Sequence, residues 1–372
     1  MKLLFFIHSL SCGGAERVTV TLANYWAVKG WEVTIVTVTG EDRDFYPLHP
    51  AVRRIALGLD GASRGSLEGI TNNWRRMRAL RGVLVKEQPA IAIAFMPTAN
   101  VLLSLAAVGL GIPTIGSERI HPPRMPLGEL WERARRYAYG RLTALVAQTT
   151  LSAEWLAENT SAKREQIAVI PNPVTLPLLV NEPRLTLADC KRDMGCARVL
   201  LAVGRLDQQK GFDRLIDAFA QLAGQEPEWG LVILGEGGQR AALEEQCRAS
   251  GLESRVRLPG AVGNVGECYQ AADLYVMTSR FEGFPNTLLE ALAHGLPAVA
   301  VDCETGPREI LRHEEDGLLV PQDDSAALLG ALKRLMADDG LRVHFSERAV
   351  EARQRFAVER VAEMWEELFS NV

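Results

Sequence analysis

The chain has 372 residues, of which 47% are hydrophobic and 23% charged, and its formal net charge is -5 at pH 7. This length exceeds that of an ordinary single domain and predicts two domains, while the composition excludes a disordered or coiled-coil chain. The acidic balance excludes nucleic acid as the main partner, because a phosphate backbone requires a basic surface.

The cysteine spacing and the N-terminal sequence indicate the cellular compartment in which the protein is expected. Six cysteines are scattered without a C-x-x-C pair or zinc-like spacing, as in a cytosolic protein with free thiols. The opening MKLLFFIHSLS is interrupted by polar residues before a signal peptide is complete, so we expect a buried first strand. No apolar segment reaches the length of a spanning helix. We expect a cytoplasmic protein, peripherally associated with the inner face of the cytoplasmic membrane.

Short runs rich in Val, Ile and Leu alternate with longer helical patterns, which is typical of strands buried on both faces of a parallel sheet. One series lies at 2–8, 31–39, 90–96, 113–118, 142–148 and 166–171. The other lies at 198–204, 231–237, 255–260, 273–279, 297–302 and 317–321. Right-handed crossovers between such strands predict two Rossmann-like, doubly wound α/β domains.

A stretch with four prolines, 171–185, separates the two series. We therefore expect an N-terminal, acceptor-side domain at 1–171, a linker at 172–196, and a C-terminal domain at 197–354 that binds a nucleotide. The tail 355–372 has apolar residues at helical spacing and predicts an amphipathic helix that packs back on the N-terminal domain. Two such domains facing a central cleft would bring the ligand-binding ends of both sheets together.

Paired glycines follow the first predicted strand, in the segment SCGGAERV. A strand, then Gly13 and Gly14, then a helix is how many α/β proteins hold a phosphate. The third glycine of the dinucleotide pattern G-x-G-x-x-G is absent, which argues against a dinucleotide-dependent dehydrogenase.

The first strand of the second domain ends in a loop with two cations. Gly204 closes the strand, and Arg205 and Lys210 precede a helix that begins near Phe212. Such cations suit a diphosphate, because they neutralise oxygens that gain charge as a bond to phosphate breaks. Either residue alone would be read as a solvated basic turn; their shared place after a core strand favours the diphosphate.

The densest signal is SRFEGFPNTLLEALAHGLPAVAVD, residues 279–302. Pro285 suits the first turn of a helix, whose free N–H groups would face a ligand. Glu282 lies in the loop and Glu290 in the helix, a separation that suits the hydroxyls of two sugars better than one metal ion. Glu290 lies among apolar residues, and a buried acid needs a partner.

In combination, GGAERV, GRLDQQKG and FEGFPNTLLE resemble the retaining glycosyltransferases of family 4, which have the GT-B fold, over essentially the whole chain. The resemblance implies that Arg205, Lys210 and Glu282 are catalytic: the two cations bind the diphosphate of a nucleotide sugar, and Glu282 contacts the transferred sugar. It implies that Glu290 holds the ribose. The remaining donor-binding residues it implies are Gly13, Gly14, Gly204, Gly283, Phe284, Pro285, Asn286, Thr287 and Leu288.

The resemblance also implies a mechanism without a metal ion or a bound cofactor. In the family, the sugar is transferred with retention on one face, and the leaving diphosphate helps to deprotonate the incoming hydroxyl. The segment 302–310 resembles the family's next loop, with Thr305 where a second glycine is often found.

The loop SERIHP, residues 117–122, departs from the family pattern, in which many members have a histidine after the corresponding strand. An SER version occurs in similar enzymes that extend cell-surface glycans, so we expect Glu118 and Arg119 on the acceptor side, with His121 nearby. Whether Arg119 or His121 contacts the donor sugar stays open, and a lone histidine is more often structural than catalytic.

Two basic stretches, 70–88 and 130–142, have the pattern of amphipathic helices with tryptophan. Such helices lie on anionic membranes or hold the phosphates of a polyprenyl diphosphate, and Arg75 and Arg78 are acceptor-side candidates. A solvated face is an equally good reading of each helix alone. The D-x-D pattern at Asp42 and Asp44 suggests a metal-bound diphosphate, but a surface turn fits better beside a metal-independent fold.

The working hypothesis is a hexosyltransferase that moves a hexose or N-acetylhexosamine from a nucleotide sugar, with UDP expected from its frequency in the family. The expected acceptor is a polyprenyl-diphosphate-linked saccharide or another cell-surface polysaccharide precursor. A sugar-nucleotide epimerase of similar architecture and a non-catalytic nucleotide-sugar-binding protein remain as alternatives.

Overall fold

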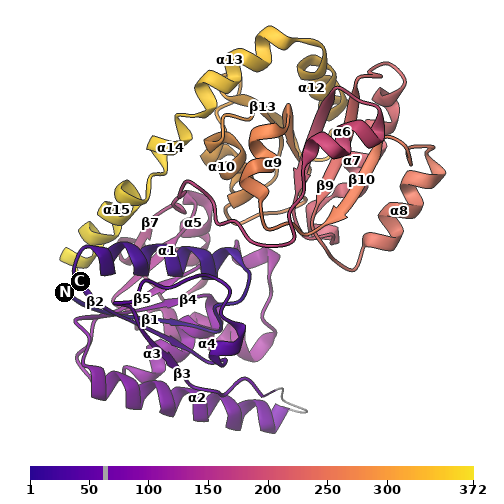
Figure 1. The fold of residues 1–372 in the computed structure, drawn as a ribbon. Coiled ribbons are helices and arrows are strands. Elements are labelled where there is room, and N and C mark those ends of the chain that lie inside the picture. Colours follow the sequence, from indigo (N-terminus) through magenta and orange to yellow (C-terminus); the bar gives the residue numbers. More distant parts are fainter. Residues whose placement is uncertain (62–65) are drawn as a thin grey trace. The chain divides into compact units, whose positions relative to one another are not determined.

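The computed structural model describes residues 1–61 and 66–372, and side chains over these ranges except at 66 and 67. The chain forms two compact units (Figure 1). Unit 1 comprises Met1–Pro173 and Val358–Val372, and unit 2 comprises Val174–Ala357. Both contain a parallel sheet covered by helices, which confirms the predicted doubly wound α/β class.

Unit 1 is built on a parallel sheet of seven strands in the order β3-β2-β1-β4-β5-β6-β7. Its strands are β1 (Lys2–Ile7), β2 (Glu32–Thr37), β3 (Arg53–Ala56), β4 (Ile91–Phe95), β5 (Thr114–Ser117), β6 (Ala144–Ala147) and β7 (Ile167–Val169). Its helices are α1 (Gly14–Val28), α2 (Ser66–Glu87), α3 (Pro97–Ala106), α4 (Glu129–Tyr139), α5 (Thr150–Asn159) and α15 (Val358–Ser370).

Unit 2 has a parallel sheet of six strands in the order β10-β9-β8-β11-β12-β13. These are β8 (Arg198–Val203), β9 (Trp229–Leu234), β10 (Val256–Gly260), β11 (Leu274–Met277), β12 (Ala298–Asp302) and β13 (Gly317–Pro321). The helices are α6 (Leu187–Met194), α7 (Phe212–Ala223), α8 (Arg240–Ala249), α9 (Val265–Ala271), α10 (Asn286–Ala293), α11 (Pro307–Ile310), α12 (Ser325–Ala337), α13 (Asp339–Ala349) and α14 (Ala352–Arg355).

Each sheet reverses its strand order once, and the reversals matter for the site. The first strand of each unit pairs on one side with the second and on the other with the fourth, so the reversals lie between β1 and β4 and between β8 and β11. In open α/β sheets, ligands bind outside the carboxyl ends of the strands at such a point.

The segment expected to be a linker, 172–196, differs from the expectation. Its residues from Val174 belong to unit 2, and it contains helix α6, which buries Leu187, Cys190 and Met194. These residues recur at helical spacing and pack into the unit 2 core, so the proline-rich sequence ends before the helix begins.

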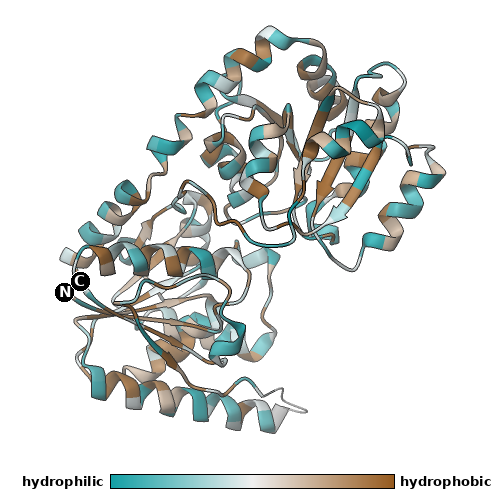
Figure 2. Cartoon of the chain, viewed as in Figure 1, coloured by the Kyte–Doolittle hydropathy of each residue, from teal (hydrophilic) through white to brown (hydrophobic). Residues whose placement is uncertain are grey.

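The C-terminal segment forms α15, which lies beside α1 in unit 1 (Figure 1). Trp365 and Phe369 of α15 are buried in one core cluster with Trp26 of α1, and Lys29 forms an ion pair with Glu366 at 2.6 Å. The brown strands in Figure 2 reflect the apolar runs from which the sheets were predicted. Strand β3 was not predicted, because RRIA is a partly exposed edge strand without the apolar run of the others.

Candidate functional site

Two loops meet at the strand reversal of unit 2. The first joins β8 to α7 and carries Lys210, and the second joins β11 to α10 and carries Glu282. Lys210 Nζ lies 2.6 Å from Glu282 Oε1, which also accepts a hydrogen bond of 2.6 Å from Ser279 Oγ. Both side chains of the ion pair are largely buried, at 15% and 7% exposure. The ammonium has three N–H groups, so this contact leaves donors for a ligand.

Backbone contacts fix these two loops to each other. Gly211 has φ +64°, and a Cβ there would lie 2.2 Å from the carbonyl oxygen of Thr278. Gln209 Nε2 donates to the carbonyl of Phe281 at 3.0 Å, and Arg280 N donates to the carbonyl of Gln209 at 2.7 Å. A glycine is required at 211 because of both its left-handed backbone and this close approach.

Arg205, predicted as the second cation, contacts Asp207 and Gln209 through its side chain. Its side chain is 75% exposed, and its Nη2 lies 3.4 Å from Asp207 Oδ2 and 3.3 Å from Gln209 Oε1. Gly204, before it, packs against the Lys210 side chain, since a Cβ at 204 would lie 3.1 Å from Lys210 Cε. The Arg205 side chain is therefore mostly exposed to solvent, whereas the Lys210 side chain is buried and paired with Glu282.

Helix α10 follows the Glu282 loop, with Pro285 at its N-cap rather than within its first turn. In its first turn, the N–H groups of Leu288 and Leu289 donate to the carbonyl of Pro285 at 3.1 and 3.2 Å. Gly283, Asn286 and Thr287 are partly exposed, whereas Phe284, Pro285 and Leu288 are buried. Thr287 Oγ1 accepts a hydrogen bond from the Tyr275 hydroxyl at 2.9 Å.

Glu290 is buried at 4% exposure, and the partner that its burial requires is the hydroxyl of Tyr269, at 3.3 Å from Oε2. His294 lies one turn later, with Nδ1 2.8 Å from the carbonyl of Glu290 and its ring 5.4 Å from that of Tyr269. Burial lowers the pKa of His294. Glu290 is thus held by a structured polar cluster inside the fold.

Thr305 has a structural role that the sequence did not predict. It is 3% exposed, and its hydroxyl donates to the backbone carbonyl of Glu282. The neighbouring Gly306 has φ +100°, and a Cβ there would lie 2.6 Å from Pro285 Cδ. The Thr305 hydroxyl therefore supports the Glu282 loop.

In unit 1, the paired glycines lie at the start of α1. Gly13 is the N-cap, with φ -161° and no side-chain cap, and its carbonyl accepts a hydrogen bond of 3.2 Å from the Tyr46 hydroxyl. A Cβ at Gly13 would lie 2.2 Å from Glu16 Oε2, so the Glu16 carboxylate folds back over the glycine. Burial raises the pKa of Glu16, while hydrogen bonds from its own N–H and from Ser9 lower it.

The SER segment follows β5, and its polar side chains are buried. Glu118 is 2% exposed and accepts a hydrogen bond of 2.5 Å from the Tyr139 hydroxyl. Burial raises the pKa of Glu118 to about 7, against the lowering effect of the Tyr139 bond. Arg119 is 6% exposed, and burial lowers its pKa to about 9. His121 is 2% exposed with Nδ1 3.0 Å from Ser152 Oγ, which favours the structural reading.

The basic helices α2 and α4 divide into surface and internal arginines. Arg75 and Arg78 are exposed on α2, whereas Arg76 donates to the carbonyl of Leu59 and Arg81 to those of Ala106 and Val108. Arg135 of α4 is buried at 2% exposure and pairs with Glu132 at 2.5 Å. Fewer arginines are therefore exposed on α2 and α4 than the number of basic residues in the sequence suggests.

The D-x-D pattern lies in a turn beside β2. Both carboxylate oxygens of Asp44 are bound by Arg54, at 2.8 and 3.0 Å, while Asp42 is exposed in the short helix Glu41–Arg43. Over residues 1–61 and 66–372 there is no group of three or more His, Cys, Asp or Glu residues able to hold a metal ion. The turn at Asp42 and Asp44 is thus held by an ion pair.

The sequence did not point to several residues that support these sites. They are Asn100, Tyr139, Tyr269, Tyr275 and Ser279. Their only sequence signal is a polar residue within or directly after an apolar run. Their partners lie up to 39 residues away in the chain, as between Asn100 and Tyr139, so the contacts depend on the fold.

Comparisons with known proteins cover both units. Residues 195–352 match the family model described as glycosyl transferases group 1, and residues 13–173 match a glycosyl transferase 4-like domain. A lipopolysaccharide core biosynthesis glycosyltransferase of Rhizobium meliloti, LpsE, is 30% identical over 94% of this chain and 93% of its own length.

Two further relatives differ in how much of them is matched. The GalNAc-alpha-(1->4)-GalNAc-alpha-(1->3)-diNAcBac-PP-undecaprenol alpha-1,4-N-acetyl-D-galactosaminyltransferase of Campylobacter jejuni is 28% identical over 100% of this chain and 99% of its own. An exopolysaccharide phosphotransferase of Streptomyces coelicolor is 37% identical over 62% of this chain, but this is only 24% of that protein.

Among solved structures, the Anabaena protein Alr3699/HepE in complex with UDP superposes with a TM-score of 0.79. The alignment covers 100% of both chains at 21% identity, so it reports on the fold.

Proposed function

This chain belongs to the group 1 and 4-like glycosyl transferases, and we propose that it transfers a hexose or N-acetylhexosamine from a UDP-linked sugar to a lipid-linked or other cell-surface glycan precursor. It is a glycosyltransferase with the GT-B fold. The donor, the acceptor and the stereochemistry are the proposed part.

One observation carries the donor assignment: the contact of Lys210 with Glu282 at the strand reversal of unit 2. A buried ammonium and carboxylate at this place offer a cation to a diphosphate and an acceptor to sugar hydroxyls. Glu290, eight positions along, supplies a second carboxylate for the ribose. The UDP bound to the Anabaena protein, whose fold is the same, supports UDP as the nucleotide.

The proposed reaction retains the anomeric configuration. The bond between the anomeric carbon and the diphosphate oxygen breaks, and the acceptor hydroxyl forms the new glycosidic bond on the same face of the sugar. Its proton passes to the leaving diphosphate. Arg205 and Lys210 stabilise the negative charge that develops on the diphosphate, so no protein nucleophile and no metal ion are required.

The acceptor assignment is supported by relatives and by the surface of unit 1. The Campylobacter relative is named for an undecaprenol-linked acceptor, and the Rhizobium relative for the lipopolysaccharide core. Helices α2 and α4 of this chain expose apolar and basic side chains together. Over the described residues no helix is both long and apolar enough to cross a bilayer. We propose a peripheral attachment through α2 and α4.

The test is a panel of UDP-, GDP- and ADP-sugars offered to the whole protein with undecaprenyl-diphosphate-linked glycans in the presence of EDTA. We expect a UDP-sugar to raise the melting temperature, because it binds only the folded state. We also expect the acceptor mass to increase by one hexose or N-acetylhexosamine, with the anomer retained in the product.

Three results would contradict the proposal. Conversion of the sugar nucleotide without any acceptor would indicate an epimerase. Binding without turnover of any acceptor would indicate a nucleotide-sugar-binding protein. Loss of activity in EDTA that manganese restores would contradict the metal-independent mechanism.

A further inference from the structure

Arg119 is a buried cation without a carboxylate partner. It is 6% exposed, its Nη1 donates to Ser117 Oγ at 3.3 Å, and its guanidinium carbon lies 5.0 Å from the centre of the Phe95 ring. Its Nε and Nη2 have no hydrogen-bond partner among the described residues. A buried cation is costly unless an anion compensates it, and no described side chain does so here.

Glu118, the neighbouring residue in the sequence, does not form an ion pair with Arg119. Glu118 accepts a hydrogen bond from the hydroxyl of Tyr139, the last residue of α4, which is buried in a different core cluster. Arg119 instead lies over Phe95, in the core cluster that includes α1 and α15. Adjacent residues at a strand end point to opposite faces, so the two charges are kept apart by the backbone.

The two unpartnered nitrogens form one edge of the guanidinium, which matches two oxygens of a carboxylate or phosphate. Elsewhere in this chain the same edge binds an acid. Nε and Nη2 of Arg54 contact Asp44 at 2.8 and 3.0 Å, and those of Arg308 contact Asp302 at 3.0 and 2.9 Å. Arg119 thus presents the geometry that the other two arginines use for an oxyanion.

The end of β5 is held firmly, so the place of Arg119 is fixed. Asn100 binds both backbone groups of Ser117 at 3.2 Å, through Oδ1 to the N–H and through Nδ2 to the carbonyl. A Cβ at Gly116 would lie 2.6 Å from Leu142 Cδ1, so the strand packs tightly on its neighbours. Asn100 and Gly116 act here as positioning residues.

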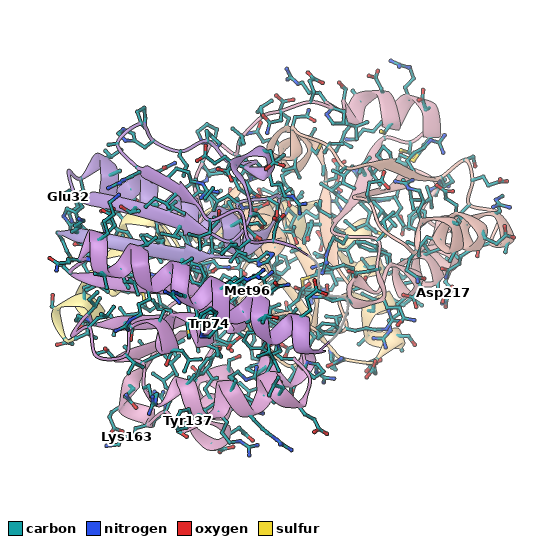
Figure 3. The ribbon with its side chains drawn as sticks, turned by 90° about the horizontal axis from the view of Figure 1, so that it is seen from below. Glu32, Trp74, Met96, Tyr137, Lys163 and Asp217 are labelled. Atoms are coloured by element: carbon teal, nitrogen blue, oxygen red, sulfur yellow. The ribbon has the colours of Figure 1, made fainter. Side chains whose placement is uncertain are left out.

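Arg119 also lies where a parallel sheet binds ligands. It follows β5 by two residues and packs over the last residue of β4, the strand that borders the strand reversal of unit 1. Met96, labelled in Figure 3, follows β4 with φ +82° and donates its N–H to the carbonyl of Ser117. Positive φ at a non-glycine residue is uncommon and often marks a binding site.

Other buried polar atoms line the same edge of the sheet. Thr39 Oγ1, shortly after β2, and Gln148 Oε1, directly after β6, are buried and have no hydrogen-bond partner among the described residues. Unsatisfied buried polar atoms are uncommon in a folded protein, and these two lie near the carboxyl ends of strands of the same sheet as Arg119.

We propose that Arg119 binds an oxyanion of a substrate, a phosphate or a carboxylate, through its Nε and Nη2 edge, with Phe95 and Ser117 orienting the guanidinium. The proposal rests on the proposed function in taking the substrate from its reaction. The anion then has two sources: the diphosphate of the nucleotide sugar, or an acidic group of the acceptor. The chemistry is the same, and the probes below separate the sources.

The test measures binding of four probes to the whole protein by calorimetry: UDP, uridine, farnesyl diphosphate and methyl glucuronide. The variant is Arg119→Met, which removes the cation and keeps an apolar side chain of similar length. We expect at least tenfold weaker binding of UDP if the donor supplies the anion. If the acceptor supplies it, farnesyl diphosphate or methyl glucuronide weakens by this factor and UDP does not. Uridine should be unaffected in either case.

Melting temperatures separate ligand binding from a purely structural role. Without a probe, Arg119→Met should melt no lower than the wild type, because replacing an unpaired buried charge with an apolar group is neutral or stabilising. The matched control is Arg135→Met, which also removes a buried arginine stacked on an aromatic ring, here Trp155. Because Arg135 pairs with Glu132, this variant should melt lower and keep its anion binding. Arg119→Lys, which retains the charge but not the fork, should bind with intermediate affinity.

The proposal is overturned if Arg119→Met melts lower or fails to fold, or if its affinity for every anionic probe stays within twofold of the wild type. It is also overturned if the wild type binds none of the anionic probes more tightly than uridine. Sugar transfer that is normal in Arg119→Met would remove this inference and leave the glycosyltransferase assignment intact. If Arg119 binds an anion but the protein transfers sugar from no donor, the proposed function is wrong and the role of Arg119 in anion binding stands.

Discussion

Glu118 shows how the fold sets the charge of a single residue. Desolvation in the core of unit 1 favours its neutral form and raises its pKa to about 7, and Glu132 adds to this effect. The Tyr139 hydroxyl and Arg135 act in the opposite direction without reversing the shift. Glu118 therefore changes its protonation near neutral pH, unlike an exposed glutamate.

The pKa of Glu118 predicts a pH dependence of stability. Its folded-state pKa lies above its unfolded value of 4.5, so the folded state binds the proton more tightly, and stability falls as pH rises from 4.5 through about 7. A shift of this size corresponds to about 3 kcal/mol. The Glu118→Gln variant remains neutral at all pH values and should lack this decline.

Urea unfolding of the wild type and of Glu118→Gln between pH 4.5 and 8 measures the difference. Glu129→Gln is the control, since this glutamate on α4 is 92% exposed and should leave the wild-type profile unchanged. Parallel stability profiles for the wild type and Glu118→Gln would show that Glu118 titrates at its ordinary pKa.

At the scale of elements, α2 and α4 expose apolar side chains beside arginines. On α2, Ile70 is 54% and Trp74 52% exposed, and the guanidinium of Arg78 lies 5.3 Å from the Trp74 ring. On α4, Tyr137 is 57% exposed and Arg141, just after the helix, stacks on it at 4.4 Å. Figure 3 labels Trp74 and Tyr137 on these helices, and Figure 2 shows apolar and polar stretches alternating along α2. Such surfaces suit the interface of an anionic bilayer.

Removing the exposed groups of α2 should weaken binding to anionic vesicles. Each basic residue near such a surface contributes about 1 kcal/mol, so the combined change Trp74→Ser, Arg75→Gln and Arg78→Gln should lower the partition coefficient by roughly thirtyfold or more. The measurement is sedimentation with phosphatidylglycerol vesicles, and neutral phosphatidylcholine vesicles should bind neither protein.

The control for this experiment is Arg192→Gln, a 72% exposed arginine on α6 of unit 2. Equal vesicle binding by the wild type and the α2 variant, at matched melting temperature, would remove α2 from the attachment surface.

Across the whole molecule, most strands could be predicted from the sequence, but the side-chain contacts between distant residues could not. Buried parallel strands appear in the sequence as continuous apolar runs, which β1 and β8 illustrate, whereas β3 has no such run. Lys210 and Glu282 were both predicted as site residues, but their contact spans 72 residues and requires β8 to lie beside β11. The sequence could not predict that Arg119 Nε and Nη2 have no hydrogen-bond partner among the described residues, because this depends on the direction of each nearby acidic side chain.

The rate of sugar transfer by Arg205→Ala measures whether this chain uses its unit 2 cations to release a diphosphate. Arg205 is 75% exposed, so its loss should leave the melting temperature unchanged while turnover falls at least 100-fold, as expected when one donor to a developing charge is removed. Arg248→Ala, an exposed arginine on α8, should retain wild-type turnover. Turnover of Arg205→Ala within twofold of the wild type would show that Arg205 does not stabilise the leaving diphosphate.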